Sequence, residues 1–251
     1  FMYDKYSEYV NTFDVSRIDN SVGAFFEYTF DNNDKLSYVL GGRMDYHNRL
    51  GAFVTPRFHL KYNAFENSVF RISAGRGKRA ANIFAENQNL FASSRTISIL
   101  GTKGEVYGLS PEIAWNYGVS FTQKFKLFSK SADVTVDFYR TDFQNQVVVD
   151  LMESPQSVVF HNLDGVSYAN SFQLEFNYEL AKHLELRSAY KYYDIKTDYL
   201  SGKYQRPLQA AHRFFGNLGY KTHALDKGQQ WKFDFTYNWI GEQQLPYTAS
   251  N

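Results

Sequence analysis

The sequence has no cysteine, little net charge and no long apolar run, and each absence removes a class of protein. Without cysteine there is no disulfide, thiolate metal site or cysteine nucleophile. A formal net charge of +1 gives no reason to expect nucleic acid as a partner, and Arg76, Lys78 and Arg79 form only a small basic patch, best explained as a solvated strand end. No segment approaches the roughly 18 apolar residues of a membrane-spanning helix, which excludes a helical membrane protein.

Motifs of known enzymes and metal sites are also missing. The six histidines are scattered, none is paired at metal-ligand spacing, and neither Gly-x-Ser-x-Gly nor His-Glu-x-x-His occurs. Ser110 and Glu112 have no histidine placed to activate a nucleophile. Asp31 and Asp34 resemble a loose calcium loop, but the remaining ligands are lacking, so a turn rich in Asn and Asp is the better interpretation. We therefore expect no enzyme, no metal site and no cofactor.

Aromatic residues are unusually abundant: they make up 18% of the chain, with 20 tyrosines and 23 phenylalanines, although the mean hydropathy is −0.47. From residue 22 onward, nearly every ordered-looking segment alternates apolar and polar side chains with period 2, the pattern of strands with two different faces. In one such segment an apolar set alternates with a polar one: Phe172, Leu174, Phe176, Tyr178 and Leu180 against Gln173, Glu175, Asn177 and Glu179.

This alternation predicts about ten strands, several of them longer than the usual 5 to 6 residues. They are residues 22–30, 36–45, 55–64, 69–79, 113–128, 133–149, 167–180, 184–197, 213–222 and 230–241. Short connections alternate strictly with long ones, and the long ones are residues 46–54, 80–112, 150–166 and 198–212. Such alternation is typical of an up-and-down outer-membrane barrel with periplasmic turns and extracellular loops.

A soluble β-sandwich or propeller also has alternating strands, but strand length argues against it. An apolar face on strands of about ten or more residues would need a partner sheet of equal length, whereas in a membrane the lipid is that partner. Lys or Arg facing lipid at mid-bilayer would cost roughly 2 to 4 kcal/mol each, so the charged face must line a wet lumen. We therefore expect an all-β fold, an antiparallel transmembrane β-barrel segment.

One stretch, SAGRGKRAANIFAEN (residues 73–87), has the spacing of a dinucleotide-binding turn at Gly75, Gly77 and Ala80. Such a turn needs a parallel βαβ unit and an acidic residue about 20 residues beyond the glycines. Position 95 is an arginine, and the preceding connections are too short for a parallel crossover. The glycines are better explained as lumen-facing residues or as bulge positions near the rim.

Three segments carry a resemblance to a known family: VLGGRMDYHNRLGAFVTPRFHLKYN (39–63), FRISAGRGKRAANIFAENQNLFASSR (70–95) and GLSPEIAWNYGVSF (108–121). Their Gly-Arg-x-Asp strand, Thr-Pro-Arg strand, Gly-x-Gly-x-Arg strand end and Leu-x-Pro-Glu strand start follow one another along the chain. In this order they resemble barrel segments of TonB-dependent outer-membrane receptors, nearest to the siderophore and cobalamin-type branch of Bacteroidota. The resemblance covers nearly the whole chain from Val22 on.

The resemblance implies that residues 1–251 are one partial transmembrane barrel domain, the C-terminal part of a larger barrel in a Gram-negative outer membrane. Large transporters of this kind close with 22 strands, so about twelve strands, the N-terminal plug and the TonB box are expected to lie outside this chain. The chain starts without a signal peptide, which leaves a soluble, processed or fragmentary protein open. It ends at Ala249, Ser250 and Asn251, where the family has a last strand with a terminal aromatic residue.

The function implied by the resemblance is energised import. Extracellular loops and plug would capture a scarce substrate such as a ferric siderophore, cobalamin or another metal chelate, and TonB, driven by the proton gradient, would release it inward. No reaction occurs on the substrate. Two alternatives stay open: a passive porin-like channel without a plug, and a structural or adhesive barrel whose loops bind a surface lipoprotein.

Two long loops carry rings, amides and guanidinium groups that together suit a bulky, partly anionic ligand. For any single residue, packing of the loops on one another or a place in the interfacial aromatic girdle is an alternative explanation. The predicted ligand-binding residues are Phe84, Asn87, Asn89, Phe91 and Arg95 in the first loop and Tyr199, Tyr204 and Arg206 in the second.

Overall fold

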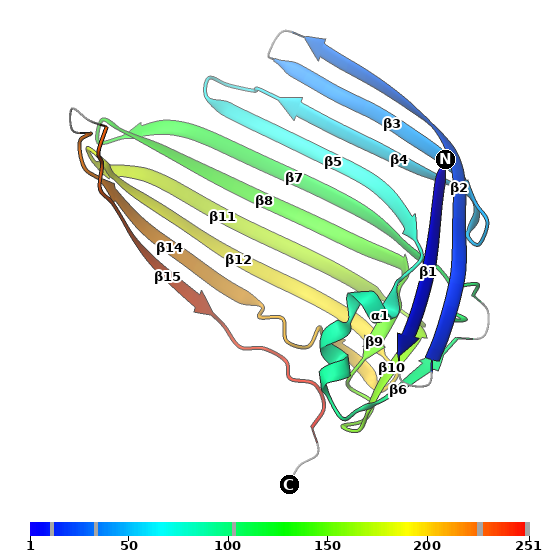
Figure 1. Ribbon diagram of the computed structural model, residues 1–251. Helices are drawn as coiled ribbons and strands as arrows, with labels where there is room; N and C mark the ends of the chain where they lie inside the picture. The colour runs from blue at the N-terminus through cyan, green and yellow to red at the C-terminus, as the bar shows by residue number, and fades with distance from the viewer. Residues whose placement is uncertain (11–12, 33–34, 102–103, 225–227, 249–251) are drawn as a thin grey trace.

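Most strands of the chain form one curved antiparallel wall (Figure 1). The computed structural model describes residues 1–10, 13–32, 35–101, 104–224 and 228–248. The strand β13 (Gly202–Gln205) pairs with the outer part of one wall strand. In spatial order the wall strands are β1 (Met2–Val10), β2 (Phe13–Asn32), β3 (Leu36–His47), β4 (Gly51–Tyr62), β5 (Ser68–Arg79), β7 (Glu112–Leu127), β8 (Lys130–Asn145), β11 (Ser167–Ala181), β12 (Leu184–Tyr199), β14 (His212–Lys221) and β15 (Lys232–Ile240).

The two faces of this wall differ in the way that the alternation predicts. Phe172 of β11 lies opposite Phe138 of β8 and Tyr192 of β12, so apolar rings continue from strand to strand on one face. Gln173, the next residue, lies opposite Asp137 and Lys191 on the other face. Successive side chains of a strand point to opposite faces, so the wall has an apolar face for lipid and a polar face for a lumen.

The wall is curved but not closed into a barrel. β1 pairs only with residues 13–21 of β2, so residues 22–32 of β2 have a partner only on the β3 side. At the other edge β15 pairs with β14 alone, and its side chains are exposed, with Phe235 at 67%. Unpaired strand edges attract further strands, so both edges are places where neighbouring strands of a complete barrel would join.

The connections depart from the sequence prediction in several places, and the first is the connection between β3 and β4. Residues 46–54 were predicted to be a long loop, but β3 continues to His47 and β4 already begins at Gly51. The Asn48 side chain ties this tight turn to β2: it accepts from Asn20 N (3.0 Å) and donates to the Ile18 carbonyl (2.9 Å). Gly51 has a positive φ of 67°, which glycine adopts at low cost.

The turn between β7 and β8 lies at Phe128 and Ser129, both with positive φ, rather than at residues 129–131. Two parts of the prediction lie outside the described residues: Asp34, and with it the calcium-like turn, and the last three residues, 249–251. The glycine-rich stretch is ordinary wall. Gly75 and Gly77 lie opposite Asn116 and Ala114 in an antiparallel ladder, on the lumen-facing positions of β5, so the dinucleotide interpretation fails there.

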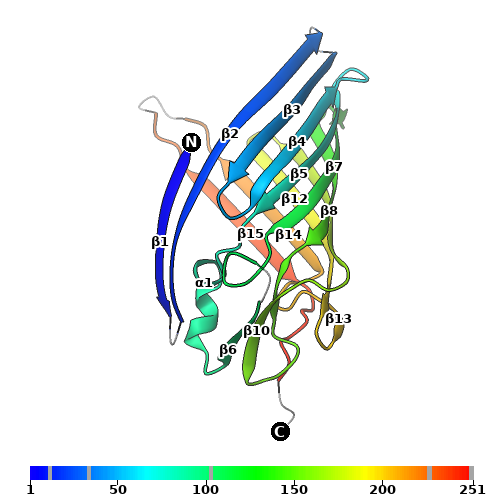
Figure 2. The same ribbon diagram turned by 90° about the vertical axis from the view of Figure 1, so that its right-hand side faces the viewer.

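The predicted strand 133–149 is wrong at its end, because the chain leaves the wall after β8. Leu163 N donates to the Gln146 carbonyl (2.8 Å), and Val147 N donates to the Glu112 carboxylate (3.1 Å). The next residues form β9 (Val147–Asp150), which pairs with β10 (Ser157–Asn162), and β10 pairs in parallel with β6 (Thr96–Leu100). This separate three-stranded sheet lies at the long-loop end of the wall (Figure 2).

Two short helices accompany this sheet: α1 (Ile83–Glu86) and the 3₁₀ helix η1 (Gln88–Ala92). None of the described helices is long and apolar enough to cross a membrane. Their apolar side chains share one core with the small sheet, centred on the fully buried Ile83, Val158 and Phe160. The long loops are therefore a packed layer over the end of the wall.

Candidate functional site

A cavity of about 680 Å³ lies between this layer and the wall. Its lining comes from β5, α1, η1, β7, β8, β9, β11, β12 and the segment after β13, so strands and loops both contribute. Binding pockets for small molecules commonly have volumes of 300 to 1,000 Å³. The cavity is thus of a size that suits a bulky small molecule.

An arginine at the end of β5 fixes α1 above the cavity. The Arg79 guanidinium donates to both carboxylate oxygens of Glu86 (2.9 and 2.8 Å) and to Glu112 at the start of β7 (2.8 Å). Glu86 also accepts from Asn82 N (3.1 Å), and Glu112 accepts from Val147 N. Bidentate arginine–carboxylate pairs set geometry as well as energy, so this cluster holds α1, β7 and β9 in one arrangement.

The patch of Arg76, Lys78 and Arg79 is therefore not simply a solvated strand end, as the sequence suggested. Arg79 joins two carboxylates. Arg76 donates to the Val54 carbonyl (3.2 Å), and Lys78 donates to the Leu50 carbonyl (2.8 Å). All three cations have structural partners.

A second anchor ties the β1–β2 hairpin to the loop between β6 and β7. Arg17 of β2 is nearly buried, donates to Asp19 (3.0 Å) and Tyr107 (3.0 Å), and also bonds Asn82. The Tyr107 hydroxyl in turn donates to Glu8 of β1. Burial, together with the bond to Glu8, raises the pKa of Tyr107 to about 12, so this phenol stays protonated at neutral pH.

A third anchor is the fully buried Asp150 at the end of β9. Its carboxylate accepts from Met152 N (2.7 Å), Glu153 N (3.2 Å) and Leu200 N (2.9 Å), and it lies 3.7 Å from His161 Nε2. Burial alone would raise the pKa of Asp150, but the partners named here lower it below its ordinary value. Asp150 thus joins the β9–β10 hairpin to the turn after β12.

The sequence-predicted ligand residues divide into two groups. Asn87, Asn89, Tyr199 and Arg206 line the cavity together, although they come from two loops that are far apart in sequence. The other four have structural contacts: Phe84 is 2% exposed in the loop core, Phe91 packs against that core, and Tyr204 packs on Tyr199.

The fourth of these, Arg95, binds main chain. Its guanidinium donates to the carbonyls of Leu151 (3.4 Å), Ser154 (3.0 Å), Ser157 (3.2 Å) and Tyr247 (2.8 Å). An arginine with four carbonyl partners ties the β9–β10 turn to the segment that follows β15. Ligand contact by all eight residues stays a prediction.

Sequence reasoning missed Arg79, Glu86, Glu112 and Gln146, all of which line the cavity. The signal for Arg79 and Glu112 was present, because each lies at the end of a predicted strand next to a long loop, where strand ends place side chains at the rim. Gln146 was hidden inside a strand that was predicted to continue to residue 149.

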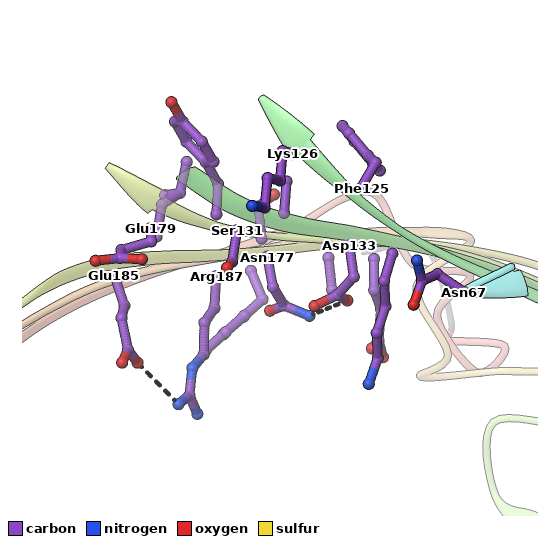
Figure 3. A pocket seen from close by; sticks show the side chains of 17 residues that line it. Asn67, Phe125, Lys126, Ser131, Asp133, Asn177, Glu179, Glu185 and Arg187 are labelled. Carbon is purple, nitrogen blue, oxygen red and sulfur yellow. Dashed lines mark hydrogen bonds and ion pairs between the residues drawn. The ribbon is translucent and has the colours of Figure 1, made fainter. Parts of the chain in front are cut away.

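The lumen face at the opposite, short-turn end is lined by charged and amide side chains (Figure 3). Asn177 donates to Asp133 (2.9 Å) and Arg187 pairs with Glu185 (3.3 Å), and all four project to one side of the sheet while Phe125 projects to the other. Within the described ranges no three His, Cys, Asp or Glu side chains are grouped to hold a metal ion. The polar wall below the cavity is thus suited to water and to polar solutes.

Comparison with known proteins bears on this architecture. Among solved structures, the siderophore receptor PirA from Acinetobacter baumannii has a TM-score of 0.67 at 12% identity, covering 94% of this chain and 35% of that chain. A mutant of the ferric enterobactin receptor PfeA from Pseudomonas aeruginosa has a TM-score of 0.63 at 14% identity, covering 94% and 34%. FpvA of P. aeruginosa, bound to pyoverdines, has a TM-score of 0.58 at 15% identity, covering 90% and 32%.

These likenesses show the fold, and the chain spans about a third of the length of each of these structures. Comparison with curated proteins gives no significant match. The family model described as "TonB dependent receptor-like, beta-barrel" matches residues 1–251. The predicted all-β fold, family and outer-membrane location are thereby confirmed. Matched over its whole length, this chain belongs to the TonB-dependent receptor-like β-barrel family of Gram-negative outer membranes.

Proposed function

We propose that this chain is the ligand-capturing part of a barrel that imports a bulky metal chelate, such as a ferric siderophore or cobalamin. The observation that carries the proposal is the cavity of about 680 Å³ beneath anchored loops at the long-loop end of a polar lumen wall. Support by likeness comes from PfeA, one of whose structures is a complex with enterobactin, and from FpvA bound to pyoverdines.

The lining favours a ligand with an apolar or amide-rich body and an anionic group. Arg79 is neutralised by Glu86 and Glu112, so it is not free to bind an anion. Arg206, in contrast, takes part in no ion pair among the residues that the structure describes, and it lines the cavity beside Tyr199. We assign Arg206 the anionic group, and the amides of Asn87, Asn89, Gln146 and Gln209 the polar groups of the ligand body.

Backbone strain next to Arg206 supports a binding role. Leu208 has a φ of 60°, a left-handed conformation that costs a branched residue about 1 to 2 kcal/mol. Its side chain is 55% exposed and lines the cavity, so burial of that side chain does not compensate the strain. Strained residues cluster at ligand sites, where surrounding structure holds them, and a ligand that covers Leu208 would recover apolar burial.

In this proposal the ligand crosses unchanged, and the protein is not an enzyme. TonB, acting through the N-terminal region of the whole protein, supplies the energy for release. A passive porin-like channel would let the ligand diffuse without TonB, and a structural barrel bound to a lipoprotein would not transport it at all. The dependence of uptake on TonB therefore separates the three functions.

The test is binding and uptake by the whole natural protein, offered a panel of ⁵⁵Fe-loaded siderophores and labelled cobalamin in cells with and without TonB. We expect one of these ligands to accumulate only with TonB, and Arg206→Gln to weaken its binding about tenfold or more, the value of a charge-assisted hydrogen bond. Lys203→Gln is the matched control, because Lys203 is a nearby exposed cation paired with Asp198 (3.3 Å) and outside the cavity.

Uptake that continues without TonB would establish a passive channel instead. Equal loss of binding in Arg206→Gln and Lys203→Gln would show that general charge, rather than the cavity, attracts the ligand. Absence of binding for the entire panel would refute the chelate class.

A further inference from the structure

The ladder between β4 and β5 stops before either strand ends. The last pair is Arg57 and Gly75, yet β4 continues to Gly51 and β5 continues to Arg79, each still paired with its other neighbour. Pro56, the residue just before Arg57 in the sequence, has no N–H to donate to a ladder. The hydrogen-bond ladder between β4 and β5 is therefore interrupted at its long-loop end.

Side chains of β5 connect to β4 where these ladder pairs are missing. Arg76 donates to the Val54 carbonyl of β4 (3.2 Å) and, across β7, to the Gln144 side chain of β8 (3.3 Å). Neither neighbour is an acid, and Arg76 takes part in no ion pair within the described part of the chain. Arg76 lies opposite Trp115 and two residues from Ala74, which places it on the apolar, lipid-facing side of the wall.

Two neighbours of Arg76, Ala74 and Trp115, line a groove on this lipid-facing side. This groove of about 380 Å³ has a floor of the small residues Gly42, Pro56 and Ala74. Large apolar side chains also line it, and these are Phe26, Leu40, Phe58 and Trp115. Of these, Phe26 and Leu40 are strongly exposed. The remaining lining residues are Gly41 and Arg57, and the Arg57 guanidinium is paired with Glu27. An apolar groove that faces the bilayer has no water to exclude and contacts acyl chains by default.

We propose that this groove binds one anionic lipid of the outer leaflet, with an acyl chain along Gly42, Pro56 and Ala74 and a headgroup phosphate against Arg76. Charge complementarity carries the choice of occupant. Arg76 is a cation without an acidic partner at the outer end of an apolar groove, and the guanidinium group suits phosphate oxygens. A lipid without phosphate would leave the Arg76 guanidinium with only the neutral oxygens of Val54 and Gln144 as partners.

The test uses the whole natural protein in phosphatidylcholine nanodiscs, titrated with diphosphoryl lipid A and with its dephosphorylated form, with bound lipid counted by native mass spectrometry. We expect one tightly bound diphosphoryl lipid A, and about tenfold weaker binding of the dephosphorylated form. Arg76→Gln should lose the same factor, whereas Arg71→Gln, which removes a cation from the lumen face of the same strand, should bind as the parent does.

A second pair of variants tests the groove itself. Ala74→Phe fills it with an apolar ring that lipid tolerates, and we expect it to reduce lipid A binding about tenfold, while Ile72→Phe, on the same face outside the groove, leaves binding unchanged. Heat-modified migration in gels checks that each variant is folded. Equal affinity for lipid A with and without phosphate, unchanged binding in both Arg76→Gln and Ala74→Phe, or a polypeptide found in place of the lipid would overturn the proposal.

Discussion

Replacement of Asp150 by asparagine is expected to loosen the loop layer without weakening the wall. The carboxylate is 0% exposed and accepts three backbone N–H groups, from Met152, Glu153 and Leu200. An asparagine has the same shape, but one of its two terminal atoms is a donor. Whichever way the amide turns, at least one backbone N–H then faces another donor, and the charge that faces His161 is gone.

The magnitude follows from that loss. A hydrogen bond to a charged group contributes about 1.5 to 3 kcal/mol, and Asp150→Asn removes at least one such bond in a buried place. The free energy for local opening of residues 147–163 and 199–205 should fall by about 2 to 3 kcal/mol, which corresponds to roughly 30- to 150-fold faster amide exchange.

Hydrogen–deuterium exchange with mass spectrometry measures this opening peptide by peptide. Peptides from β7 and β8 should exchange as in the parent, because their ladder does not involve Asp150. Asp142→Asn is the control: Asp142 pairs with Arg140 on an exposed face, where such a pair contributes at most about 1 kcal/mol. Unchanged exchange in Asp150→Asn, or faster exchange spread evenly over wall and loops, would refute the assignment of Asp150 as the anchor of this layer.

Three further predictions concern pH, the hairpin anchor and the wall. Burial lowers the pKa of His161, but Asp150 raises it, and the net pKa lies above the ordinary 6.5. The stabilisation by this pair is therefore complete below pH 6.5 and is lost as pH rises through the raised pKa. Amide exchange of the loop layer should become faster over that pH interval, and His161→Gln should abolish this pH dependence. Tyr107→Phe removes the hydroxyl that ties the β1–β2 hairpin to the loop between β6 and β7, so proteolysis should reach the hairpin several-fold faster while the barrel stays intact. Equal rates would contradict the anchor. Gly118→Val adds a Cβ that would lie only 2.4 Å from the Tyr139 ring. This overpacking should lower the free energy of unfolding, measured in a urea titration, by about 1 to 3 kcal/mol. Gly77→Val should not, because a Cβ at Gly77 meets nothing within 4 Å.

The sequence predicted the wall well because lipid and lumen impose opposite chemistry on alternate side chains. The register confirms this for β11, where Phe172 and Gln173 continue the rows of their neighbours. The signal weakens outside the membrane. β10 was missed because it is the central strand of the small sheet, so Val158, Val159 and Phe160 are all buried, and a continuous apolar run of this length does not distinguish strand from loop core.

Four of the eight residues predicted for ligand binding line the cavity. Composition alone pointed to rings, amides and arginines in two loops, and the structure brings Asn87 and Arg206 of these loops to one cavity. Composition could not distinguish Arg206 from Arg95, because the difference lies in partners that are remote in sequence. Arg95 donates to four main-chain carbonyls, and the one farthest away in sequence is that of Tyr247. β1 was missed because its sequence, MYDKYSEYV, does not alternate apolar and polar residues, although burial alternates along the folded strand.

The parallel pairing of β6 with β10 has a consequence for how such receptors diversify. Two loops from different parts of the chain share one ladder, in which Thr96 lies opposite Ser157 and Ile99 opposite Phe160. Insertion of a single residue into either strand would turn its core side chains outward. Natural variants of these two loops must therefore be inherited as a matched pair, and a chimera that exchanges only one of them with a homologue would be expressed with its outer layer unfolded.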